Sequence, residues 1–99
     1  MRFTNKTVFI TGAAGGIGRQ TGLSFAKEGA NVAVSDLDFD MASRVAKEIK
    51  SAGGNAEPFQ LDVTNQNETI ENMKNAYEHF GSLDIAFCNA GIREIVSPL

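Results

Sequence analysis

Four short apolar runs alternate along the chain with longer stretches in which apolar residues recur at helical intervals. The runs are rich in β-branched, aromatic and small apolar residues and cover Thr7 to Thr11, Asn31 to Ser35, Ala56 to Leu61 and Leu83 to Cys88. Runs of this length and composition are typical of parallel strands buried on both faces. Their alternation with helices predicts right-handed βαβ units, with helices on both faces of a parallel sheet.

The three intervening segments have the spacing of amphipathic helices, because apolar residues return every three or four positions until a glycine ends the pattern. The stops are Gly29, Gly53-Gly54 and Gly81. The recurring positions in the first segment are Ile17, Thr21, Phe25 and Ala26. In the second, Ala42, Val45, Ala46 and Ile49 form one apolar face, and in the third, Ile70, Met73, Ala76, Tyr77 and Phe80 are expected to form a buried stripe.

Two local signals refine this arrangement. Asn65 followed by Glu68 predicts a capping box at the start of the third helix. Pro58 lies inside the third apolar run, and proline is tolerated only at a sheet edge because it has no N–H for the ladder. The strand order 3-2-1-4 satisfies this requirement, since it places the third strand outermost.

Glycine is concentrated between the first strand and the first helix, in Thr11-Gly12-Ala13-Ala14-Gly15-Gly16-Ile17-Gly18. A backbone needs such a segment where it closely approaches another group, and a helix N-terminus offers unpaired N–H groups to an anion. We therefore infer a pyrophosphate at this turn. The spacing is not Gly-x-Gly-x-x-Gly, and Arg19-Gln20 after Gly18 excludes a P-loop. Taken alone, the loop is also compatible with a glycine-rich turn that binds no ligand.

Asp36 closes the second apolar run, eighteen positions after Gly18. A carboxylate about twenty residues beyond the loop can accept hydrogen bonds from both hydroxyls of an adenosine ribose. It would repel a 2′-phosphate about 5 Å away by roughly 3 kcal/mol per unit charge at an effective dielectric near 20. No arginine or lysine lies in Ala13 to Gly15 or directly after Asp36 to offset this, so NAD is favoured over NADP. The alternative is a helix N-cap or turn acid.

The motif Thr-Gly-x-x-x-Gly-Ile-Gly resembles the cofactor loop of the short-chain dehydrogenase/reductase family. Two later strand ends are similar to the family as well. Asp62-Val63 matches the pair that contacts the adenine, and Asn89-Ala90-Gly91 matches the end of Asn-Asn-Ala-Gly, with Cys88 in place of the first asparagine. The resemblance covers nearly the whole chain and implies an incomplete α/β Rossmann-type doubly wound parallel sheet.

The resemblance further implies an oxidoreductase that uses NAD and acts on a small-molecule alcohol or ketone. The residues expected at the cofactor are Gly12, Gly15, Gly16, Ile17, Gly18, Asp36, Leu37, Asp62, Val63, Asn89, Ala90 and Gly91.

The catalytic residues of the family are not found in this chain. They are a serine and a tyrosine with a lysine four positions later, and they follow a fifth strand. Tyr77 is the only tyrosine, Gly81 stands four positions after it, and its place on an apolar stripe predicts a core residue. We therefore expect no catalytic and no metal-binding residue here. Residues 1–99 are interpreted as the amino-terminal, NAD-binding portion of a longer enzyme, inactive alone and a homo-oligomer when complete.

A non-catalytic dinucleotide-binding or interaction module remains the alternative function. A phosphoacceptor or flavodoxin-like domain ranks lower, because it would not need Gly12, Gly16 and Gly18 together with Asp36.

Composition adds only exclusions. A formal net charge of −3 gives no reason to expect nucleic acid or an anionic membrane as a partner. No apolar run approaches membrane-spanning length and the first six residues hold no signal-peptide core, so a cytoplasmic protein is expected. The single cysteine, Cys88, fits a reducing compartment and is expected to be buried as a small hydrophobic residue.

Overall fold

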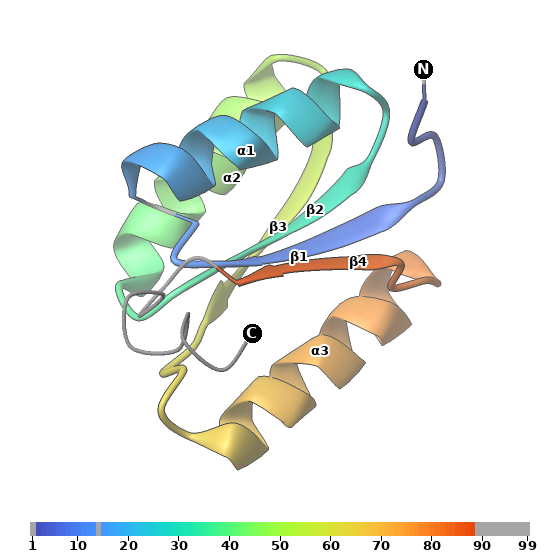
Figure 1. The fold of residues 1–99 in the computed structure, drawn as a ribbon. Helices are drawn as coiled ribbons and strands as arrows, with labels where there is room; N and C mark the ends of the chain where they lie inside the picture. The colour runs from blue at the N-terminus through green and yellow to red at the C-terminus, as the bar shows by residue number, and fades with distance from the viewer. Residues whose placement is uncertain (1, 14, 89–99) are drawn as a thin grey trace.

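Strands and helices alternate along the whole of the part that the structure, a computed structural model, describes: residues 2–13 and 15–88. The elements are β1 (Thr7–Thr11), α1 (Gly16–Lys27), β2 (Asn31–Asp36), α2 (Phe39–Ser51), β3 (Asn55–Gln60), α3 (Gln66–Phe80) and β4 (Ile85–Cys88). All strand pairs are parallel, in the order β3-β2-β1-β4 (Figure 1). The predicted Rossmann-type α/β fold and its strand order are therefore confirmed.

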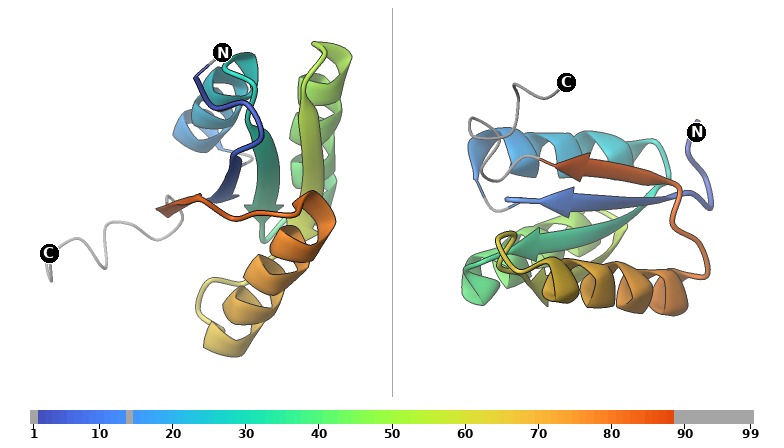
Figure 2. Two further views of the ribbon diagram at one scale, coloured as in Figure 1. Left: turned by 90° about the vertical axis from the view of Figure 1, so that its right-hand side faces the viewer. Right: turned by 60° about the horizontal axis from the view of Figure 1, so that its bottom comes forward.

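The sheet is covered on both faces, with α1 and α2 on one side and α3 on the other (Figures 1 and 2). Along β1, Val8 and Ile10 belong to the core beneath α1 and α2, while Phe9 packs in the core beneath α3. Successive side chains of a strand point to opposite faces. Both faces of β1 are therefore dry, which explains why its sequence is apolar throughout rather than alternating.

The ends of the elements follow the signals in the sequence with small shifts. The strand predicted from Ala56 begins at Asn55, and the strand predicted from Leu83 begins at Ile85. Gly81 ends α3 in the left-handed region at φ 86°. Pro58 lies on β3, which among the described residues pairs with β2 alone, so the edge position expected for this proline is confirmed.

The expected burial of the third helix was wrong in part. Ala76 is buried, but Tyr77 is 55% exposed and Ile70 is 58% exposed. At about 100° per residue, Tyr77 and Ile70 lie roughly 100–120° around the helix from Ala76. The apolar stripe is thus wider than the part of α3 that touches the sheet, and Tyr77 is not a core residue.

Cys88 is also exposed, contrary to the expectation that it would be buried. It ends β4, where Ile85 and Phe87 are half-buried and Ala86 and Cys88 are exposed. Among the described residues β4 pairs with β1 only, so its outer side chains have fewer neighbours than those of a central strand. Within the same described ranges, no helix is both long and apolar enough to cross a membrane.

Asp84 ties the beginning of β4 to the beginning of β1. Its Oδ2 accepts a hydrogen bond from the backbone N–H of Thr7 at 2.8 Å, and its own N–H donates to the Thr7 carbonyl at 3.0 Å. The hydrogen bond from the Thr7 N–H lowers the pKa of the Asp84 carboxyl below its usual value, and a hydrogen bond with the Ser82 side chain lowers it further. The folded protein therefore favours the charged form of Asp84.

This shift predicts an acid-dependent contribution to stability. Because the folded-state pKa is lowered, the contribution is fully present above about pH 4 and is lost as the pH falls through the lowered value. Asp84→Asn should remove this contribution. The free energy of unfolding of the variant should therefore decline less than that of the wild type between about pH 5 and about pH 2, the interval in which carboxyl groups titrate. Urea unfolding of the intact protein at several pH values measures this. A variant that declines as steeply as the wild type would contradict it.

Candidate functional site

The carboxyl ends of β1, β2 and β3 meet at one edge of the sheet. A cavity of about 230 Å³ lies at this edge, and Gly12, Asp36 and Asp62 reach it from the ends of the three strands. Its remaining lining residues are Leu37, Leu61, Val63 and Thr64. The structure therefore brings together residues from three separate strand ends that the sequence had marked as cofactor contacts. The carboxyl edge is where ligands bind in open parallel sheets.

Two glycines of the loop are required by the backbone geometry of the fold, whether or not a ligand binds. Gly12 has a φ of +63°, a conformation that side chains rarely adopt. A Cβ on Gly18 would overlap the Gly12 carbonyl oxygen and lie 2.8 Å from the Cα of Ala13. The first turn of α1 thus packs directly on the backbone that leaves β1.

For two other glycines of the loop, the described structure gives no steric reason why a side chain could not stand there. A Cβ on Gly16 would meet nothing within 4 Å, and one on Gly15 would come no closer than 3.8 Å to the Gly12 carbonyl oxygen. Both residues are exposed, as is Ile17 at 67%. A Cβ at Gly16 would therefore enter open space above the start of α1, which is where a bound group would need room.

The start of α1 differs from the starts of the other two helices. Asp38 caps α2 by accepting from the Met41 N–H at 3.2 Å, and Asn65 caps α3 by accepting from the Glu68 N–H at 3.0 Å. Among the described residues, no side chain caps α1 and no acid lies in its first turn. Its first N–H groups and the positive end of its dipole therefore face the glycine turn without a negative side chain.

Asp36 is half-buried at the end of β2, and its Oδ1 accepts from the Asp38 N–H at 3.0 Å. This contact is an Asx turn, so Asp36 does serve as the turn acid that the sequence offered as an alternative to a ribose contact. The helix N-cap is Asp38 rather than Asp36. Asp36 nevertheless lines the cavity, beside Leu37, whose side chain is 65% exposed.

Asp62 lines the same cavity from the turn after β3. Its Oδ1 accepts from the Thr64 hydroxyl at 2.6 Å and from the Thr64 N–H at 3.0 Å. These hydrogen bonds, the hydroxyl first, lower the pKa of the Asp62 carboxyl. The cavity therefore carries a stable negative charge on this side.

Arg19, the first cation after the loop, is held by α2. Its Nε donates to Glu48 Oε1 at 2.9 Å, and its Nη2 pairs with Glu48 Oε2. The hydrogen bond and the charge of Glu48 raise the pKa of the Arg19 guanidinium. Because both guanidinium contacts are to Glu48, the Arg19 side chain is paired with α2 rather than with the cavity residues.

Sequence reasoning missed two lining residues, Leu61 and Thr64. Leu61 is 2% exposed and forms the floor of the cavity. Its position as the last apolar residue before Asp62 was the available signal. Thr64 was recognisable as the partner in an Asp-x-Thr turn. The expected contacts Asn89, Ala90 and Gly91 lie outside the described residues.

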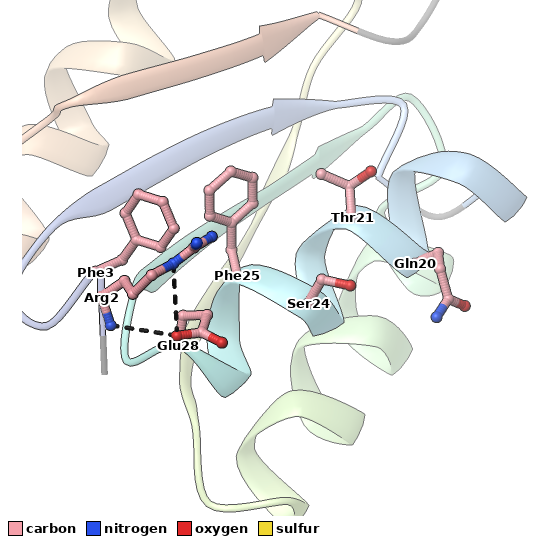
Figure 3. Close-up of a pocket in the computed structure, with 7 residues that line it drawn as sticks. All are labelled: Arg2, Phe3, Gln20, Thr21, Ser24, Phe25 and Glu28. Carbon is pink, nitrogen blue, oxygen red and sulfur yellow. Dashed lines mark hydrogen bonds and ion pairs between the residues drawn. The ribbon is translucent and has the colours of Figure 1, made fainter.

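A larger cavity of about 400 Å³ lies along α1 and is closed by Arg2 and Phe3, which precede β1 (Figure 3). Phe3 and Phe25 form its apolar part, with ring centroids 5.1 Å apart. Arg2 and Glu28 lie 4.0 Å apart with exposed side chains, an ion pair of little energetic weight. None of the expected cofactor residues lines this cavity.

Comparison with known proteins identifies the family. The family model described as short chain dehydrogenase matches residues 6–99. The chain belongs to the short-chain dehydrogenase family. Members of this family use the nicotinamide cofactors NAD or NADP.

Individual short-chain dehydrogenases are similar over most of this chain. It is 37% identical to the 3-oxoacyl-[acyl-carrier-protein] reductase of Thermotoga maritima, covering 93% of this chain and 37% of that protein. It is 38% identical to the cyclohexanol dehydrogenase of an Acinetobacter species, covering 92% and 36%. The crystal structure of hydroxysteroid dehydrogenase from Escherichia coli matches with 39% identity and a TM-score of 0.88, covering 91% and 38%. The chain thus spans little more than a third of the length of these relatives.

The different roles of the glycines give a stability prediction. Gly18→Ala forces a Cβ onto the Gly12 backbone and should destabilise the fold by about 2–3 kcal/mol. Gly16→Ala enters open space and should change stability by no more than about 0.5 kcal/mol. Chemical denaturation of the intact protein compares the two variants. Equal losses at both positions would show that the close contact at Gly18 does not constrain the loop.

Proposed function

We propose that this chain binds the adenosine diphosphate half of NAD at the carboxyl edge of the sheet. The observation that carries the proposal is the juxtaposition of two features. Among the described residues, the start of α1 has no side-chain cap and has open space at Gly16. It lies beside a cavity that Asp36 and Asp62 enter from neighbouring strands. A dinucleotide needs both a pyrophosphate site and a nucleoside site.

The residues fit this ligand in chemical type. The N–H groups at the start of α1 would hold the pyrophosphate, with Gly15, Gly16 and Ile17 around it. Asp36 would accept from the hydroxyls of the adenosine ribose. Leu37 and Val63, both exposed apolar side chains, would flank the adenine, and Asp62 would lie at its edge. Asn89, Ala90 and Gly91 remain proposed contacts.

NAD is proposed over NADP on electrostatic grounds. A 2′-phosphate on the ribose would lie close to the Asp36 carboxylate and be repelled by it. Arg19 is paired with Glu48 on α2, so using it to offset that repulsion would require this ion pair to break. The combination favours a ribose with free hydroxyls.

The complete protein is proposed to be an oxidoreductase that interconverts an alcohol and a carbonyl. Two relatives carry names of this chemistry, a cyclohexanol dehydrogenase and a 3-oxoacyl-[acyl-carrier-protein] reductase. Bound NAD would supply the hydride acceptor. Tyr77 is exposed on α3, with Gly81 four residues later. We therefore place the proton-transfer residues outside these 99 residues. A cytoplasmic location and a homo-oligomeric state stay predictions.

Replacement of Asp36 tests the ribose contact. Asp36→Ala in the intact protein should weaken NAD binding by about tenfold, because hydrogen bonds to a charged group are lost, while NADP binding should weaken less or improve. Calorimetric dissociation constants for both cofactors give the ratio. Asp40→Ala, an exposed acid in the first turn of α2, is the matched control and should leave the ratio unchanged. A ratio that does not move toward NADP in Asp36→Ala would refute the ribose role.

Replacement of Gly16 tests the pyrophosphate contact. Gly16→Val should weaken NAD binding by at least about tenfold without unfolding the protein, because the side chain occupies the space above the helix start. Ser24→Val, at an exposed position of the same helix, is a suitable control. Gly22 is not, since it is buried against Ile10, Val32 and Ile49. NAD affinity retained in Gly16→Val would place the pyrophosphate elsewhere.

A chain limited to residues 1–99 tests the separation of binding from catalysis. It should show no NAD-dependent turnover with a panel of alcohols and ketones, because the chain lacks a tyrosine with a lysine four positions later and such proton transfer contributes about 10²–10⁴ in rate. NADH absorbance at several substrate concentrations measures this. Turnover above background would require a base among these residues.

A further inference from the structure

The carboxylate of Glu68 reaches backward past the start of its own helix. Its Oε1 accepts a hydrogen bond from the Asp62 backbone N–H at 2.8 Å. A capping box would instead direct it to the N–H of Asn65, the N-cap residue. That N–H already donates to the Asp62 carbonyl at 2.9 Å. The expected capping box is therefore half formed, because the Asn65 side chain accepts from the Glu68 N–H while the Glu68 carboxylate binds Asp62, two residues after β3.

A second contact one turn later joins the same two parts of the chain. The Asn72 side-chain N–H donates to the Gln60 carbonyl at 3.2 Å and to the Glu68 carbonyl at 2.9 Å. Gln60 is the last residue of β3. The first two turns of α3 are thus hydrogen-bonded to the end of β3 and to the turn after it.

This support matters because β3 is an edge strand. Among the described residues it has only β2 as a neighbour, and the last ladder contact on that side is the Leu61 N–H to the Asp36 carbonyl, at 3.0 Å. Beyond Leu61 the backbone has left the sheet. The direction of Asp62 and Val63 therefore depends on hydrogen bonds outside the sheet. Glu68 accepts from the Asp62 N–H, and the Asn65 N–H donates to the Asp62 carbonyl.

We propose that Glu68 is a positioning residue for the adenine end of the dinucleotide. By holding the Asp62 N–H, it fixes the wall of the cavity that Asp62 and Val63 form. Glu68 does not line the cavity, so its effect on the ligand is exerted through this wall. The inference rests on the proposed dinucleotide site and adds a determinant of nucleoside recognition to it.

The experiment compares two ligands in the intact protein. NADH contains the adenosine half, whereas reduced nicotinamide mononucleotide lacks it, and fluorescence titration gives a dissociation constant for each. Glu68→Ala should weaken NADH binding by about three- to tenfold, the loss expected for one hydrogen bond, and leave the mononucleotide unaffected. Glu68→Gln keeps an acceptor oxygen and should restore NADH affinity to within about twofold. Glu71→Ala, an exposed glutamate on the same helix, should match the wild type.

Asn72→Ala provides a second variant if Glu68→Ala does not fold. It loosens the end of β3 while the Asn65 cap remains, and it should also weaken NADH selectively, by about two- to threefold.

The inference is overturned if Glu68→Ala weakens both ligands equally, if Glu71→Ala weakens NADH as much, or if neither Glu68→Ala nor Asn72→Ala changes NADH affinity. Wild-type protein that binds neither ligand would overturn the proposed function itself.

Discussion

The close packing of α1 on the end of β1 is the constraint on which the site depends. Gly18 lies against the Gly12 carbonyl, so closely that a single added carbon would overlap it. This contact places the start of α1 directly beyond the strand, where no side chain of the described residues caps the helix N–H groups. The left-handed conformation of Gly12 makes the required turn. Gly16, at the start of the same helix, is exposed, and a Cβ there would meet no atom of the described residues within 4 Å.

Most of the fold could be predicted because each element carries its own local signal. Val8, Phe9 and Ile10 form an unbroken apolar run only because both faces of β1 are covered. Pro58 identified an edge strand before the order was known, since a central strand would need its N–H. The ends of β2 and β3 could be aligned in advance for a similar reason. Parallel strands bring their carboxyl ends to one edge, which places Asp36 and Asp62 beside one cavity.

The features that sequence could not supply depend on angles between elements. Tyr77 belongs to the apolar stripe of α3, but its burial depends on how much of that stripe faces the sheet. Cys88 looked like a core residue until β4 was seen to have one neighbour among the described strands. Glu68 was recognised as a capping residue, yet its partner changed because Asn65 had already used its N–H. Periodicity fixes a face along one helix, whereas these outcomes require the neighbouring element.

We infer that the dinucleotide lies at the carboxyl edge rather than in the larger cavity at Phe3 and Phe25. Backbone amide NMR of the intact protein during titration with NAD tests it most directly. Binding at the carboxyl edge should give saturable shifts at the amides of Gly15 to Gly18, Leu37 and Asp62 to Thr64, with no comparable changes at Phe3 or Phe25. Shifts centred on Phe3 and Phe25, with the glycine loop unaffected, would contradict it.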